Sequence, residues 1–91
     1  MTVDHPAYRV AAALGHRQRG ILRLVADHPG AHNRNTARHA IGMDTQRVGY
    51  GYAPSDRLIE RGLVELDDAG RMRLTAAGRV TVTALDELER L

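Results

Sequence analysis

The first third of the chain has apolar positions at helical spacing, interrupted by glycine and proline. The stretch PAYRVAAALG is rich in alanine, with Pro6 where a first helical turn tolerates proline and Gly15 where a helix can end. It therefore predicts a helix over residues 6–14. The next apolar stripe predicts a central core helix over residues 17–28, which ends there because Pro29 disfavours helical backbone in the residue before it.

Two further helices, separated by a tight turn, are predicted in the middle of the chain. Asn33 or Asn35 can cap a helix over residues 34–41, and Gly42 can end it in the left-handed conformation. A second helix is predicted over residues 44–61. This order of helix, glycine-containing turn and helix is typical of a helix-turn-helix, in which the second helix is the reader.

The second of these helices carries an interruption. Its segment GYGYAPS holds two glycines and Pro54, which are poor residues for a helix interior, and proline also removes one backbone hydrogen bond. We therefore expect the helix over residues 44–61 to be kinked or broken near residues 49–54. A short N-terminal tip would then act as the reader.

A change from helical to alternating periodicity marks a hairpin after this helix. Val64, Leu66, Met72 and Leu74 alternate with polar residues on either side of the turn-forming cluster DDAG. The pattern predicts a two-stranded hairpin over residues 63–75.

The last segment is predicted to form one helix over residues 76–91. Thr75 can cap it, and its apolar residues stand three apart along one side. A chain this short leaves much of its surface exposed, so a second copy is the simplest partner. We expect this helix, with the helix over residues 6–14 as a second candidate, to form a homodimer interface through Val82, Leu85, Leu88 and Leu91.

These elements predict a single domain over residues 1–91, mainly α with a small β-hairpin, in the α+β class. At 91 residues, one compact core is the limit. No apolar run in the sequence approaches the ~20 residues that span a bilayer, and the first residues carry no export or lipid-anchor signal. We therefore expect a cytoplasmic protein with no membrane partner. The lack of cysteine excludes disulfides and thiolate chemistry.

Charge is distributed unevenly along the chain. All 13 cationic side chains are arginines, whose planar guanidinium suits phosphates and guanine edges. Residues 5–57 hold eight arginines against three acids, a balance of +5, whereas residues 58–91 hold five against seven, a balance of −2. A positive face is therefore expected in the first two-thirds of the chain.

Two sequence strings, in order, resemble the winged-helix regulators of the MarR and ArsR type. AALGHRQRGILRLVADHPG resembles the ArsR-type opening, and RLIERGLVELDDAGRMRLTAAGR resembles the MarR-type segment that ends the recognition helix, forms the wing and starts the next helix with LTxAGR. Together they cover roughly residues 12–80. The chain departs from the family pattern in two places: Ala37 and Gly42 stand five apart rather than four, and GYGYAPS adds about three residues.

The resemblance implies a winged helix-turn-helix fold, with N-terminal and C-terminal helices flanking the motif. It also implies a sequence-specific double-stranded DNA-binding transcriptional regulator, of the bacterial repressor type, that acts as a homodimer. The alternative is a winged-helix module for protein–protein interaction with weak or no DNA binding, which the modest net charge of +2 favours.

The start of the reading helix supplies the candidate base contacts Thr45, Gln46 and Arg47. Threonine offers a methyl and a hydroxyl group, glutamine an amide that can pair with adenine, and arginine a guanidinium that can pair with guanine. The alternative is that all three are ordinary exposed polar residues.

Four other residues are candidates for the DNA backbone. Arg34 and Arg38 flank the first helix of the motif, which crosses the backbone, so we expect them to contact phosphate. Tyr50 and Tyr52 could reach phosphate or sugar through their hydroxyl groups, or could fill the core of a chain without phenylalanine or tryptophan.

The hairpin adds two arginines. Arg71 and Arg73 stand two apart and so share one face of a strand, from which they can lie on the DNA backbone or in a narrow minor groove. Asp67 and Asp68 at the tip would repel phosphate. A solvated or self-paired wing is therefore the alternative.

The sequence offers no catalytic or cofactor site. It lacks a glycine-rich phosphate loop, a nucleophile elbow, an HExxH motif and paired carboxylates, so we expect no enzyme activity and no cofactor. His28, His32 and His39 lack the spacing and the cysteine or carboxylate partners of a metal site. We expect no metal, and a small-molecule or metal effector that shifts the DNA-competent population remains an unsupported alternative.

Overall fold

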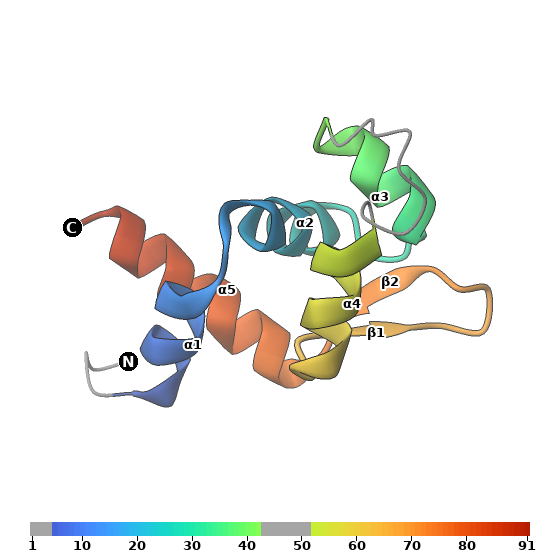
Figure 1. The fold of residues 1–91 in the computed structure, drawn as a ribbon. Helices are drawn as coiled ribbons and strands as arrows, with labels where there is room; N and C mark the ends of the chain where they lie inside the picture. Colours follow the sequence, from blue (N-terminus) through green and yellow to red (C-terminus); the bar gives the residue numbers. More distant parts are fainter. Residues whose placement is uncertain (1–4, 43–51) are drawn as a thin grey trace.

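The computed structural model describes residues 5–42 and 52–91, and these residues form five helices and a two-stranded sheet (Figure 1). This confirms the predicted class, mainly helical with a small antiparallel hairpin. In chain order the elements are α1 (Pro6–Ala13), α2 (His16–Asp27), α3 (Arg34–Ala40), α4 (Ala53–Glu60), β1 (Val64–Leu66), β2 (Met72–Leu74) and α5 (Ala76–Glu89).

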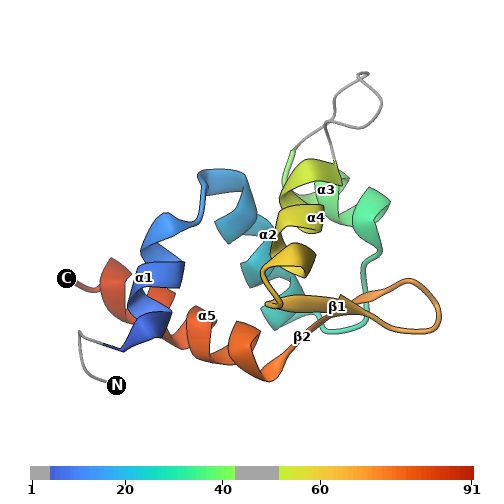
Figure 2. The same ribbon diagram turned by 60° about the horizontal axis from the view of Figure 1, so that its bottom comes forward.

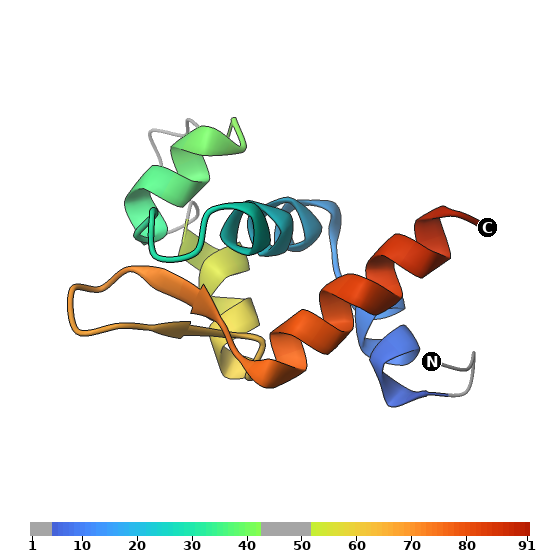
Figure 3. The ribbon, with the colours of Figure 1, turned by 180° about the vertical axis from the view of Figure 1, so that it is seen from behind.

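The elements gather at two ends of an elongated molecule of 40 × 26 × 20 Å. Figure 2 shows α1 packed on α5 at one end and the hairpin projecting from the other. Seen from behind in Figure 3, α2 lies in the middle, with α3 beyond it on the side of the hairpin. Within residues 5–42 and 52–91, none of the helices has the length and apolar character to cross a lipid bilayer.

Helix α4 starts inside the segment where the sequence predicts a break. It begins at Ala53, with Tyr52 as N-cap residue and Pro54 in its first turn. Proline fits there because the first backbone N–H groups of a helix have no partner within it. The predicted helix over residues 44–61 is therefore represented among the described residues by Ala53–Glu60.

The hairpin has the predicted alternation and also an unpredicted neighbour. Val64 pairs with Leu74 and Leu66 with Met72 across the two strands. On the outer side of β2, Met72 N donates to His32 O at 2.7 Å, and Met72 O accepts from Gly30 N at 2.9 Å. The loop between α2 and α3 thus runs beside β2 like a further strand.

Two apolar clusters hold the molecule together. The larger one lies where α2 meets α3, α4 and the hairpin, and consists of Leu14, Ile21, Leu22, Val25, Ala37, Leu58, Leu63, Val64 and Met72. The smaller one joins α1 to α5 and consists of Ala7, Tyr8, Ala11, Ala84 and Leu85, with Leu88 packed against it.

This packing corrects the predicted dimer stripe. Leu85 is only 1% exposed, because α1 of the same chain covers it, so Leu85 is not available to a second copy. Val82 and Leu88 also pack partly against the clusters of their own chain. Leu91 alone of the four is open to a partner, with 94% of its surface exposed. The three-residue spacing indicated a face that is covered within the same chain, by α1 at Leu85 and Leu88 and by the larger cluster at Val82.

Gly78 allows α5 to lie against the chain that enters β1. A Cβ atom at this position would stand 2.0 Å from the backbone oxygen of Leu63, which is too close for any side chain. Thr75, which caps α5 by accepting from Gly78 N, also donates its backbone N–H to Leu63 O. The glycine of the LTAAGR string, Gly78, is therefore needed for steric reasons.

Candidate nucleic-acid interface

The candidate interface lies at the end of the molecule that carries α3, the start of α4 and the hairpin (Figure 1). Helix α3 is short but firmly started. Asn33 accepts from the backbone N–H of Thr36, and the Thr36 hydroxyl accepts from the backbone N–H of Asn33. Because this reciprocal cap satisfies two N–H groups that a helix start leaves free, it fixes the direction of α3. Arg34 and Arg38, four residues apart, then share one face.

Tyr52 lies against both of these arginines. The Cζ atom of Arg34 is 5.0 Å from the centre of the Tyr52 ring, and that of Arg38 is 5.1 Å from it. Both distances fall within the range of cation–π attraction. Tyr52 is partly buried beneath these two cations and belongs to neither apolar cluster, so it does not fill the core as one predicted alternative had it. Three predicted backbone contacts come together here.

The two arginines differ in their polar partners. Arg34 Nη1 donates to Asp56 Oδ1 at 2.8 Å, in a pair whose side chains are both more than two-fifths exposed. Arg38 Nε donates to the neutral amide oxygen of Asn35 at 3.0 Å, and no acidic side chain pairs with it among the described residues. Arg38 therefore keeps its full positive charge, whereas that of Arg34 is partly compensated. Asn35 and Asp56 were not predicted as partners of these arginines, because contacts between side chains leave no periodic pattern in the sequence.

Both wing arginines contact the protein itself. Arg71 Nη1 donates to the backbone oxygen of Ala31 at 3.2 Å, and Arg73 Nε donates to Asp67 Oδ2 at 3.3 Å. Both bonds are long, and each guanidinium has further N–H groups to offer. The predicted alternative of a self-paired wing therefore describes Arg73, while Arg71 retains its charge without an acidic partner among the residues described.

Asp67 shapes the hairpin tip. Its Oδ1 atom accepts from the backbone N–H groups of Arg71 at 3.0 Å and Ala69 at 2.9 Å. The N–H of Arg71, the N–H of Ala69 and the guanidinium of Arg73 hold the pKa of Asp67 below its ordinary value. This carboxylate is a structural part of the turn, and Asp68 is the tip acid that faces solvent without that role.

A shallow groove of about 260 Å³ separates α3 from the hairpin. It combines amide, guanidinium and phenol groups with one exposed apolar side chain, Leu66, of which 41% is exposed. Its walls are Asn33, Arg34, Asn35, Tyr52, Leu66, Ala69 and Gly70. The side-chain donors lie on one wall, at α3 and the start of α4, where they can contact a phosphate backbone that lies along the groove.

Four other predicted site residues are not placed by the structure. Thr45, Gln46, Arg47 and Tyr50 lie outside the described residues, so their base and backbone contacts stay predictions.

The rings of His28 and His32 lie edge to face with centres 6.2 Å apart. In the described ranges, no three histidine, aspartate or glutamate side chains gather as ligands of a metal ion.

Comparison of this chain with models of known protein families, with curated proteins and with solved structures finds no match.

Proposed function

We propose that this chain is a sequence-specific double-stranded DNA-binding regulator of the winged helix-turn-helix type. The observation that carries the proposal is the pair of guanidinium groups on Tyr52, at the end of the molecule where the hairpin projects. A stacked guanidinium loses less conformational freedom on binding than a free one, and it still presents N–H donors to phosphate.

The role of each arginine in DNA binding follows from whether it has an acidic partner. Arg38 and Arg71, which lack acidic partners among the described residues, hold the phosphates. Arg34 is oriented by Asp56 and Tyr52 and adds a directed contact. Phosphate contacts of this kind set the register of a protein on the duplex, and contacts to base edges provide sequence preference. Thr45, Gln46 and Arg47 remain the residues proposed for that second task.

A salt titration of duplex binding, followed by fluorescence anisotropy, tests the proposal. Loss of one phosphate contact in Arg38→Ala should lower the slope of log affinity against log salt by about 0.9 and weaken binding equally for all sequences. Arg90→Ala is the matched control, because Arg90 is exposed at the end of α5, away from α3 and the hairpin. Arg47→Ala should instead reduce discrimination between sites.

Substitutions of Tyr52 test the stacked arrangement itself. Tyr52→Phe keeps the ring and should bind DNA as the parent does. Tyr52→Leu should bind up to about fivefold more weakly, because it removes two cation–π contacts of ~0.5 kcal/mol each that hold the guanidinium groups in place. Equal effects of Arg38→Ala and Arg90→Ala, or the absence of salt-dependent binding to any duplex, would overturn the proposal.

One observation favours a second candidate, a protein-interaction module. Asp56 and Asp67 compensate two of the arginines, and Leu66 offers an exposed apolar contact beside them. The same titration separates the two functions. A protein that retards no duplex at low salt, and forms a stable complex with another protein that Leu66→Asp abolishes, would be such a module.

A further inference from the structure

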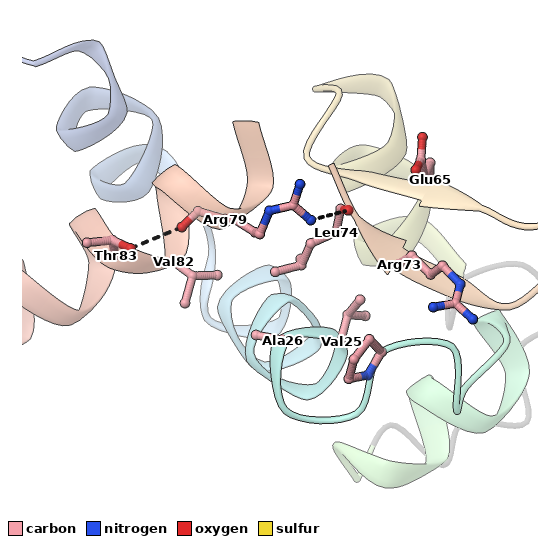
Figure 4. Close-up of a pocket in the computed structure, with 9 residues that line it drawn as sticks. Val25, Ala26, Glu65, Arg73, Leu74, Arg79, Val82 and Thr83 are labelled. Atoms are coloured by element: carbon pink, nitrogen blue, oxygen red, sulfur yellow. Dashed lines mark hydrogen bonds between the residues drawn. The ribbon is translucent and has the colours of Figure 1, made fainter. Parts of the chain in front are cut away.

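A second groove, of about 540 Å³, lies behind the hairpin, between the end of α2, strand β2 and the first half of α5 (Figure 4). Its volume falls within the range of small-molecule sites. It shares Arg73 with the hairpin but does not include Tyr52, Arg34 or Arg38, which carry the proposed DNA-binding surface.

The floor of this groove is aliphatic and fixed in place. Val25 is a buried member of the larger core cluster, and Leu74 and Val82 pack against that cluster from β2 and α5. Ala26 and Pro29 extend the floor along α2. A ligand that covers this floor would remove apolar surface from water without disturbing the core.

Arg79 brings a positive charge to the rim of the groove. Within the described chain, its side chain donates one hydrogen bond, from Nη1 to the backbone oxygen of Leu74, and at 3.5 Å this bond is long and weak. No acidic side chain of the described residues pairs with Arg79. Figure 4 shows its guanidinium next to Leu74, which places a charged donor directly beside the apolar floor.

The other charged groups of the groove do not satisfy Arg79. Arg73 lies at the far side, where its guanidinium occupies the space beside Gly30 that a Cβ atom would otherwise fill, and it already pairs with Asp67. Glu65 stands opposite Arg73 in the hairpin register, and in Figure 4 its side chain points away from Arg79. Arg79 is therefore an exposed cation without an acidic partner among the described residues, at the rim of an apolar floor.

From this arrangement we infer that the groove binds a small carboxylate with an apolar body. The carboxylate accepts two N–H bonds from Arg79, and the apolar body covers Ala26, Leu74 and Val82, which are partly exposed, whereas Val25 lies buried beneath them. A guanidinium binds a carboxylate through two parallel bonds, which fixes orientation as well as charge. The inference does not depend on DNA binding, because none of these apolar residues belongs to the proposed DNA surface.

Calorimetric titration with three matched probes tests this inference. Octanoate has both the charge and the apolar chain, 1-octanol has the chain without the charge, and acetate has the charge without the chain. Octanoate should bind at least about tenfold more tightly than either of the others, because hydrogen bonds to charged groups and apolar burial both contribute.

Variants then locate the site. Arg79→Gln should weaken octanoate binding about tenfold by removing the charge-assisted bonds, while substitution of the exposed Arg90 at the opposite end of α5, Arg90→Gln, should leave it unchanged. Ala26→Leu should block the floor without changing any charge. Thermal unfolding of each variant checks that the fold is kept.

Three results would overturn the inference. Acetate binding as tightly as octanoate would show a general anion site, and equal effects of Arg79→Gln and Arg90→Gln would show that octanoate binds elsewhere. Undetectable octanoate binding by a folded parent protein would do so as well.

Discussion

At the scale of single residues, one side chain at the hairpin tip shows how a charge can serve structure rather than binding. Asp67 accepts hydrogen bonds from two backbone N–H groups and one guanidinium, and these bonds lower its pKa. Sequence reasoning identified the tip acids and the turn, but treated both aspartates alike. It could not separate Asp67 from Asp68, because only the turn geometry decides which carboxylate faces the backbone N–H groups.

The lowered pKa of Asp67 predicts a dependence of stability on pH. A carboxyl group with a folded-state pKa below its unfolded value of ~3.9 stabilises the fold above that value, and this contribution is lost as the pH falls through the folded-state pKa. Asp67→Asn, which keeps the Oδ1 acceptor but cannot ionise, should therefore make stability less dependent on pH below about 4.

Urea unfolding between neutral and acidic pH measures this effect. Asp68→Asn is the matched control, since Asp68 is the neighbouring tip acid and is exposed. Parallel pH profiles for the parent and the Asp67→Asn variant would contradict the structural role assigned to Asp67.

At the scale of elements, the sequence pattern located the helices and the hairpin, but not all the contacts between them. Apolar periodicity depends on the chain alone, so the hairpin, α2 and α5 could be predicted closely. The run of Gly30 and His32 beside β2 was not predicted, because backbone hydrogen bonds of a loop leave no periodic pattern. The contact of Tyr52 with Arg34 and Arg38 was missed for a similar reason, since it joins separate helices.

Two helix glycines give opposite predictions for the same substitution. Gly78→Ala should destabilise the protein by about 1–3 kcal/mol or more, because its Cβ would stand 2.0 Å from Leu63 O and α5 would have to move. Gly20→Ala should stabilise it by about 0.5–1 kcal/mol, because the nearest atom, Ile41 Cγ2, is 3.5 Å from the new Cβ and alanine favours helix.

Chemical denaturation of the two variants provides the measurement, and each serves as the control for the other. A Gly78→Ala variant as stable as the parent would mean that the close approach of α5 to Leu63 is not needed for the fold.

At the scale of the whole molecule, α5 joins the two ends. Arg23 of α2 donates to Asp86 at 2.7 Å and to Glu89 at 2.6 Å, and these carboxylates raise its pKa. The buried face of α5 is covered by α1, which sequence reasoning could not foresee, because an apolar stripe shows that a helix face is covered but not by what. A homodimer, if it forms through α5, must use its outer face and Leu91.

Substitution of two leucines of this C-terminal region tests that account. Leu85→Ala should lower the free energy of unfolding by about 2–5 kcal/mol, because it opens a cavity in the cluster that joins α1 to α5. Leu91→Ala should have little effect on the fold, since Leu91 is 94% exposed.

Denaturation at several protein concentrations distinguishes a contact within one chain from a contact between chains, because only the second makes the loss of stability depend on concentration. The loss in Leu85→Ala should be the same at every concentration, because the contact lies within one chain. A loss that shrinks as the concentration rises would instead place Leu85 between chains.

The hydrogen bonds of Met72 to Gly30 and His32 have a practical consequence for dissecting this protein. Because β2 is paired on both sides, the hairpin cannot be removed without affecting the rest of the fold. A truncation that removes the hairpin would also release the loop that leads into α3, and with it the capped helix that presents Arg34 and Arg38. The contribution of the wing can therefore be isolated only by replacing side chains such as Arg71, with the backbone left intact.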